Sequence, residues 1–149
     1  MAKTGSEDTS PLQFPVVGIG ASAGGLDAVK TFLRALPAKS GMAYVFVQHL
    51  SPVHESLLPE ILQKVAHFPV QKITDNIHLE PDNLYIIPQN KIVTATDGVL
   101  KLAPLDEKHT KSNTIDLFFS SLGGSASKLC SRCSIIGCFA RWNPRFTGY

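Results

Sequence analysis

The sequence predicts an α/β protein, in which a doubly wound, mainly parallel sheet carries a β-hairpin insertion. Two observations predict this class: strand-like and helix-like segments alternate over residues 14–66, and a group of shorter β segments follows over residues 70–102. Strand, helix, strand and helix in succession favour parallel pairing through right-handed crossovers. The 149 residues, 44% of them hydrophobic and 17% charged, suffice for one domain.

The first strand is expected over residues 14–20, a β-branched run that ends in glycines. Apolar residues then recur at helical spacing over residues 26–36, and Pro37 closes this segment. Residues 1–13 are polar and without periodicity, so we expect a disordered N-terminal tail.

The second unit repeats this plan. An apolar strand is expected over residues 43–47, and a helix over residues 57–66 with Ser56 as its N-cap. Pro59 then falls at the third helical position, where its missing N–H costs little. The apolar face of this helix consists of Leu58, Ile61, Leu62 and Val65.

Residues 70–102 contain short β segments separated by turn signals, which predict a β insertion at one side of the sheet. The segments are 84–87, 91–94 and 99–102, and the turns are Pro88-Gln89-Asn90 and Asp97-Gly98, the latter a common hairpin signal.

The last part of the chain begins with a polar loop at residues 106–113. A third helix is expected from Ile115, with Gly123 and Gly124 as its stop. Residues 134–139 have the composition of one more buried strand.

Charge and composition exclude several classes of protein. The formal net charge is +2 and the pI is about 8.5, too mild for a nucleic-acid-binding face. No apolar run is long enough for a membrane span, and the polar start is unlike a signal peptide, so a cytoplasmic protein is expected. Three cysteines, an odd number without a secretion signal, argue against a disulfide framework. A zinc site is not expected either, because Cys130, Cys133 and Cys138 have no fourth ligand nearby.

The most informative segment is the glycine-rich turn Gly18-Ile19-Gly20-Ala21-Ser22-Ala23-Gly24-Gly25 between the first strand and the first helix. Three interpretations of Ser22 fit the pattern. It can be the N-cap of the helix, or part of a phosphate-binding loop, or a nucleophile on a turn with oxyanion donors beside it. The spacing G-x-G-x-x-x-G is one residue longer than the dinucleotide fingerprint, and no G-K-[ST] follows.

The second strand adds a possible base, because it ends in Gln48-His49. If the first two strands are parallel neighbours, Ser22 and His49 emerge at the same edge of the sheet, where open α/β folds bind ligands. A histidine within hydrogen-bond reach of a serine hydroxyl can accept its proton during attack on an acyl carbon. A solvated loop residue is the other interpretation of His49.

Four motifs in order resemble the catalytic domain of CheB, the chemotaxis protein-glutamate methylesterase. They are the segments 14–25, 47–52, 84–88 and 115–119. The motifs G-I-G-A-S-A-G-G and Q-H-L-S-P are most similar to those of CheB domains that are fused to a CheR-type methyltransferase and sensor modules.

The resemblance implies a serine hydrolase that removes methyl groups from glutamates of chemoreceptors, and often deamidates glutamines. It implies that Ser22 is the nucleophile and His49 the general base, without a metal or organic cofactor. The implied partners are methylated chemoreceptor glutamates, together with CheR-type methyltransferase and sensor modules. Neither nucleic acid nor a membrane span is expected.

The resemblance also implies a third catalytic residue, an aspartate in a G-x-G-x-D-G loop after a late strand, and this sequence lacks it. No Asp or Glu follows Asp116, which belongs to the I-D-L-F-F motif instead. The resemblance therefore implies a partial methylesterase domain over residues 14–122, whose sheet is incomplete at the C-terminus, and a divergent tail over residues 123–149. One hypothesis is that this tail is truncated and read in an altered frame; the other is a natural, shortened homologue.

The functional expectation is a methylesterase with weakened or no activity. The alternative is a noncatalytic interaction or regulatory module of a chemosensory pathway that keeps the fold without the triad. A nucleotide-binding Rossmann domain is a third hypothesis, but it predicts an acidic residue after the second strand, where His49 stands instead.

Overall fold

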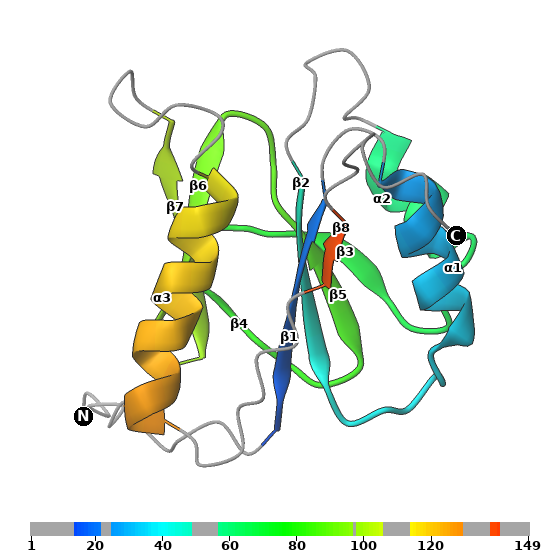
Figure 1. The fold of residues 1–149 in the computed structure, drawn as a ribbon, viewed down its shortest axis with the longest axis horizontal. Coiled ribbons are helices and arrows are strands. Elements are labelled where there is room, and N and C mark those ends of the chain that lie inside the picture. Colours follow the sequence, from blue (N-terminus) through cyan, green and yellow to red (C-terminus); the bar gives the residue numbers. More distant parts are fainter. Residues whose placement is uncertain are drawn as a thin grey trace, which may run out of the picture.

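A five-stranded sheet forms the centre of the fold, and each of its strand pairs is parallel (Figure 1). The computed structural model describes residues 14–21, 25–48, 57–96, 98–105, 114–129 and 138–140. The strand order is β3-β5-β2-β1-β8. The strands are β1 (Val16–Ala21), β2 (Ala43–Gln48), β3 (Val70–Lys72), β5 (Asn83–Ile86) and β8 (Cys138–Ala140).

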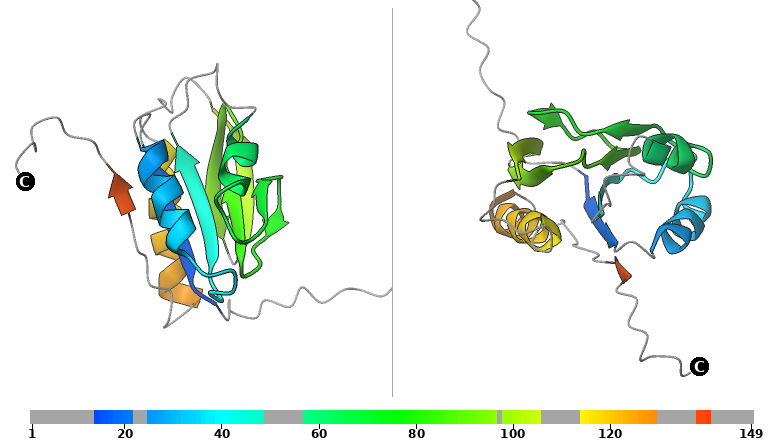
Figure 2. Two further views of the ribbon diagram at one scale, coloured as in Figure 1. Left: turned by 90° about the vertical axis from the view of Figure 1, so that its right-hand side faces the viewer. Right: turned by 90° about the horizontal axis from the view of Figure 1, so that it is seen from above.

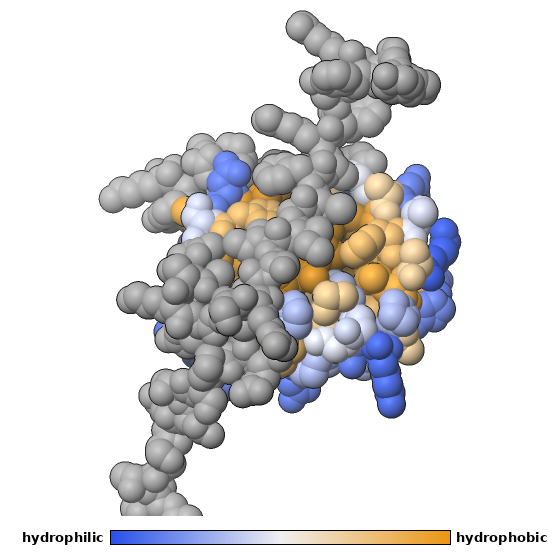
Figure 3. All heavy atoms as spheres, turned by 60° about the horizontal axis from the view of Figure 1, so that its bottom comes forward, coloured by the Kyte–Doolittle hydropathy of each residue, from blue (hydrophilic) through white to orange (hydrophobic). Residues whose placement is uncertain are grey.

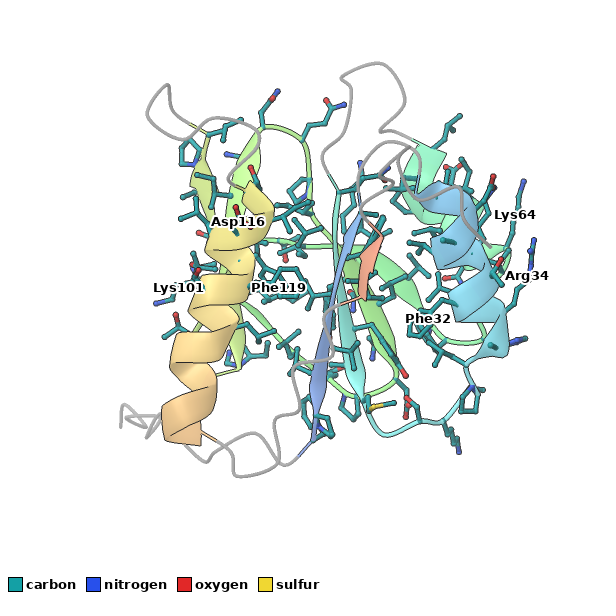
Figure 4. All side chains as sticks on the ribbon, viewed as in Figure 1. Phe32, Arg34, Lys64, Lys101, Asp116 and Phe119 are labelled. Carbon is teal, nitrogen blue, oxygen red and sulfur yellow. The ribbon has the colours of Figure 1, made fainter. Side chains whose placement is uncertain are left out.

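Two helices cover one face of this sheet, α1 (Leu26–Ala35) and α2 (Leu58–Gln63). Their buried residues form one core with alternate residues of the strands, among them Val17, Ile19, Tyr44 and Phe46. Figure 4 shows Arg34 and Lys64 pointing away from the sheet on this side, so the charged residues lie on the outer surface of the helices.

The opposite face is covered by the helix α3 (Thr114–Leu129) and a three-stranded antiparallel sheet. The strands of this second sheet, in the order β4-β7-β6, are β4 (Ile77–His78), β7 (Val99–Pro104) and β6 (Lys91–Thr96). The view from above in Figure 2 shows α1 and α3 on opposite sides of β1. The prediction of a doubly wound, mainly parallel sheet is therefore confirmed.

The extent of the β insertion was predicted wrongly. The hairpin of β6 and β7 forms as expected, with Gly98 at φ +76°. The segment 84–87, however, belongs to the parallel sheet, where β5 pairs with β2 and β3. The reason is burial: Leu84 and Ile86 face α1 and α2, whereas Tyr85 faces the other core, so this apolar run is covered on both sides as a central parallel strand requires.

The ends of two helices also differ from prediction. The N-cap of α2 is Leu57, without a side-chain capping bond, instead of Ser56, which lies outside the described residues; Pro59 is in the first turn. The helix ends at Gln63 instead of residue 66. The Gln63 side chain donates to the carbonyl oxygen of Phe68 and accepts the N–H of Val70, in the segment leading into β3.

Gly123 and Gly124 do not stop α3, which continues to Leu129. A glycine inside a helix costs only about 1 kcal/mol relative to alanine, and the strong helix formers Ala126 and Lys128 follow. A late strand forms at Cys138–Ala140, where β8 pairs with β1, and it shares Cys138 and Phe139 with the segment 134–139 predicted as a strand; residues 134–137 lie outside the described residues. The N-terminal tail 1–13 and the loop 106–113 lie outside the described residues.

Hydrophobic residues reach the surface in the middle of the face seen in Figure 3, with hydrophilic residues around its margin. Among the described residues, Leu57 is the large hydrophobic side chain that is exposed, at 55%. Other apolar residues at the surface, such as Phe32 of α1 and Phe119 of α3, are partly buried against the two cores. No described helix is long and apolar enough to cross a membrane.

Candidate active site

The carboxyl ends of three adjacent strands meet at one edge of the parallel sheet. Ala21, the last residue of β1, is the register partner both of Gln48 at the end of β2 and of Ala140 at the end of β8. In Figure 1 this edge lies at the top of the sheet, where α1 also begins. An edge of this kind is where open α/β sheets bind their ligands.

The two residues predicted to act in catalysis, Ser22 and His49, lie outside the described residues. What the structure describes is the residue before each: Ser22 follows Ala21 in the sequence, and His49 follows Gln48. The expected parallel pairing of β1 and β2 is confirmed, with Ala21 opposite Gln48 as the last pair of the ladder. The roles of Ser22 and His49 remain predictions.

The first two glycines of the turn motif have a packing role. Gly18 and Gly20 lie inside β1, not in a loop, and they face α3. A Cβ at Gly18 would stand 2.8 Å from Cε1 of Phe119, and a Cβ at Gly20 would stand 3.0 Å from Cγ2 of Ile115. Figure 4 shows Phe119 pointing from α3 toward β1. Because these two glycines have no side chain, α3 can pack closely against β1. The phosphate-loop interpretation is wrong for both glycines.

The N-terminus of α1 lies at the same edge. Its N-cap is Gly25, which has no side chain, so the interpretation of Ser22 as the N-cap residue is wrong. The backbone N–H of Val29 bonds the carbonyl of Gly25 at 3.1 Å, which begins the helical ladder. The positive end of the helix dipole therefore faces the edge that carries Ser22 in the sequence, an arrangement that favours developing negative charge.

Gln48 is the described polar residue that is buried within the core, at 8% exposure. Its side chain lies on the α1 and α2 side of the sheet, because it continues the alternation of Tyr44 and Phe46 along β2. Its Oε1 atom is buried and has no hydrogen-bond partner among the described residues. Sequence reasoning missed Gln48; the available signal was an amide at the end of an otherwise apolar strand.

The structure also describes two further histidines and one cysteine. His67 is exposed, with Nε2 3.3 Å from the carbonyl oxygen of Arg34, and His78 is exposed in β4. Cys138 is in β8, whereas Cys130 and Cys133 lie outside the described residues, as do His54 and His109.

Two groups with shifted pKa values, Asp82 and Tyr85, have a structural role. Hydrogen bonds from the backbone of Gly41 and Ser40 hold the pKa of Asp82 below its usual value, and these residues lie at the amino end of β2, opposite the candidate site. Burial raises the pKa of the Tyr85 hydroxyl, which accepts a bond from the N–H of Glu80.

Fold and edge geometry define a doubly wound α/β domain with a candidate site at the carboxyl ends of β1 and β2. The family model described as CheB methylesterase matches residues 17–132. The chain belongs to the CheB methylesterase family.

Curated relatives agree with this assignment. A protein-glutamate methylesterase/protein-glutamine glutaminase of Desulfotalea psychrophila is 30% identical over 72% of this chain and 31% of its own length. One of Geobacillus kaustophilus is 32% identical over 83% of this chain and 36% of its own length. A third, from Leptospira interrogans and named as putative, is 29% identical over 74% of this chain and 58% of its own length. The chain thus spans about a third to three fifths of the relatives it matches.

The crystal structure of the Thermotoga maritima CheB methylesterase catalytic domain matches the fold with a TM-score of 0.65 and 22% identity. The match covers 82% of this chain and 65% of that one.

Proposed function

We propose that this chain carries the nucleophile and general base of a protein-glutamate methylesterase that acts in the cytoplasm on methylated chemoreceptor glutamates. The observation that carries the proposal is the register pair of Ala21 and Gln48, since the residue after each is Ser22 and His49. Neighbouring parallel strands are 4.7–4.9 Å apart. Side chains that follow such a pair can approach to hydrogen-bond distance.

The reaction would proceed by acyl transfer. His49 accepts the proton of the Ser22 hydroxyl as Oγ attacks the carbonyl carbon of the glutamate methyl ester. The protonated His49 then returns this proton to the departing methoxide, which leaves as methanol. Water, deprotonated by His49, hydrolyses the acyl-serine, and the products are the glutamate carboxylate, methanol and a proton. The chemistry needs no metal or organic cofactor.

Two features of the fold suit this mechanism. The positive end of α1 at the same edge would stabilise the oxyanion that forms when Oγ adds to the ester carbonyl. The close approach of α3 to Gly18 and Gly20 gives β1 a rigid support directly before Ser22.

The rate of this chain should be low. An orienting carboxylate normally holds the histidine of such a triad, and its loss costs about 10⁴-fold in kcat. Strand β8 ends beside Ala21, but the residues that follow Ala140 in the sequence contain no Asp or Glu. We therefore propose weak or absent turnover for the chain as given.

The test is methanol release from a methylated chemoreceptor fragment by the purified chain. Ser22→Ala and His49→Ala should abolish any release. Ser120→Ala and His78→Ala are matched controls, because both side chains are exposed away from the candidate edge, and they should leave release unchanged. Release that survives Ser22→Ala would contradict the proposal.

A second candidate function is a noncatalytic module that binds chemoreceptors, or CheR-type methyltransferase and sensor modules, through the same fold. The absence of any acidic residue after Asp116 favours it. It predicts that the chain binds a methylated receptor fragment with the same affinity whether or not Ser22 is replaced by alanine. An affinity that depends on Ser22, accompanied by methanol release, would exclude it.

A further inference from the structure

The strand β3 lies at one end of the parallel sheet, and among the described strands it pairs with β5 alone. The carbonyl oxygen of Pro69 faces β5, where it accepts the N–H of Leu84 at 2.9 Å. Neighbouring residues of an extended chain direct their backbone groups to opposite sides, so Phe68 and Val70 present theirs to the outer edge. An open edge of this kind is where a strand of another chain can pair.

The side chain of Gln63, the last residue of α2, lies at this outer edge. Its Oε1 accepts the N–H of Val70 at 2.9 Å, and its Nε2 donates to the carbonyl oxygen of Phe68 at 3.2 Å. The two bonds fix the orientation of the amide, because the reverse orientation would bring donor to donor and acceptor to acceptor.

The two bonds match those of a further parallel strand. One residue of such a strand would donate to the carbonyl of Phe68 and accept the N–H of Val70, with Pro69 as the residue opposite it. The amide of Gln63 therefore takes the place of one residue of an added strand. Because α2 packs against β3, its last residue is within reach of the edge.

Other features of β3 also limit pairing at its edge. The strand has three residues, Pro69 precedes it, and Lys72 is exposed at its end. Short edge strands, proline and lysine are devices by which natural proteins prevent association through a sheet edge. The bonds of Gln63 fit the same purpose.

We propose that Gln63 covers the outer edge of β3 and prevents the sheet from extending through β3 into a second copy of this chain. A second copy is the partner because every copy presents the same edge, so two copies can pair antiparallel about a two-fold axis with identical contacts. The proposal concerns association and not turnover, so it does not depend on the proposed function.

The experiment compares three variants of the full chain with the parent by sedimentation equilibrium at matched concentrations. Gln63→Ala removes the amide but keeps a strong helix former in α2, and it should form dimers that dissociate on dilution. Gln63→Glu keeps an acceptor for the N–H of Val70 and adds a charge at the edge, so it should associate no more than the parent.

Gln71→Ala is the matched control. It removes another glutamine of β3, whose Nε2 bonds Oδ1 of Asn83 in β5, and so leaves the outer edge covered. It should associate no more than the parent. If Gln71→Ala associated as strongly as Gln63→Ala, a general loss of stability would explain both, and the inference would be wrong.

Amide hydrogen exchange at Val70 locates the association. In dilute Gln63→Ala this amide should exchange about fivefold faster than in the parent, because it has lost its acceptor. Exchange should slow again as the concentration rises and β3 pairs with its copy. The inference is overturned if Gln63→Ala associates no more than the parent, or if it associates while the Val70 amide stays in fast exchange.

Discussion

Gly18 lies so close to Phe119 that a methyl group at position 18 would stand 2.8 Å from Cε1 of the ring. Phe118 is the next neighbour, at 3.0 Å, and the two phenylalanine rings meet edge to face with centroids 5.4 Å apart. The glycine of β1 and the aromatic pair of α3 therefore form one packing unit, which joins the strand before the candidate nucleophile to the helix on the far side of the sheet.

Gly18→Ala should lower the free energy of unfolding by about 1–3 kcal/mol, because an added methyl group in a filled core forces side chains to move. The entropy that alanine removes from the unfolded chain offsets only about 0.4–1 kcal/mol of this. Urea unfolding measures the loss. Gly20→Ala should cost less, since its nearest contacts are 3.0 and 3.1 Å.

The double variant Gly18→Ala, Phe119→Leu separates the contact from other effects of alanine. A smaller side chain at position 119 should relieve the clash, so the double variant should lose less stability than the sum of the two single variants. Strict additivity would show that the methyl group at position 18 does not act through Phe119.

Asp82 should make the stability of the fold depend on pH in the acid range. Its Oδ1 accepts bonds from the N–H groups of Gly41 at 2.9 Å and Ser40 at 2.7 Å, and these bonds hold its pKa below the usual value. A lowered pKa in the folded state means that the contribution is fully present above the ordinary Asp pKa of about 4. It is lost as the pH falls through the lower, folded value.

Asp82→Ala should therefore lower the melting temperature at pH 6 and make it less sensitive to pH between about 2 and 5. Melting curves across this range check the prediction. Asp27→Asn is the control, because this carboxylate is 97% exposed and its ion pair with Lys30, at 3.8 Å, should contribute little. Equal pH profiles for the parent and Asp82→Ala would contradict the assignment.

Local sequence patterns were enough to predict the first βαβ unit. The strand β1, the helix α1 and the strand β2 follow from β-branched runs and helical periodicity within short windows, and their parallel pairing follows from their order. The edge at which Ala21 and Gln48 end could be predicted for the same reason. Ser22 was chosen as a candidate because it is the hydroxyl of the glycine-rich turn after β1, and His49 because it follows β2; their roles stay predictions.

Features that depend on distant residues could not be predicted in this way. The role of Gly18 requires Phe119, which no local window contains, so a phosphate loop stayed open as one of three interpretations of the glycine-rich turn. Strand β5 was assigned to the insertion because turn residues follow it, whereas its place is decided by burial between two cores. Gln48 was overlooked because only the three-dimensional structure shows that its Oε1 is buried.

Tyr85→Phe tests the hydrogen bonds that hold the segment leading into β5. The hydroxyl oxygen of Tyr85 accepts the N–H of Glu80 at 2.8 Å, and the hydroxyl donates a long bond of 3.4 Å to the carbonyl oxygen of His78. Since Tyr85 is 1% exposed, removal of its oxygen should cost about 1–2 kcal/mol of unfolding free energy. Tyr44→Phe is the comparison: it removes a bond to Oγ of Ser40, which also accepts the N–H of Met42, and it should cost less.

Tyr85→Phe should also change how the stability of the fold depends on pH. Burial raises the pKa of Tyr85, so the folded state favours the neutral hydroxyl. Its contribution is present below the ordinary tyrosine pKa of about 10 and is lost as the pH rises through the higher, folded value. The parent chain should therefore lose stability above a pH of about 10 more steeply than Tyr85→Phe, measured as urea midpoints from pH 8 to 11. Parallel alkaline profiles would mean that the Tyr85 hydroxyl ionises as readily in the folded chain as in the unfolded one.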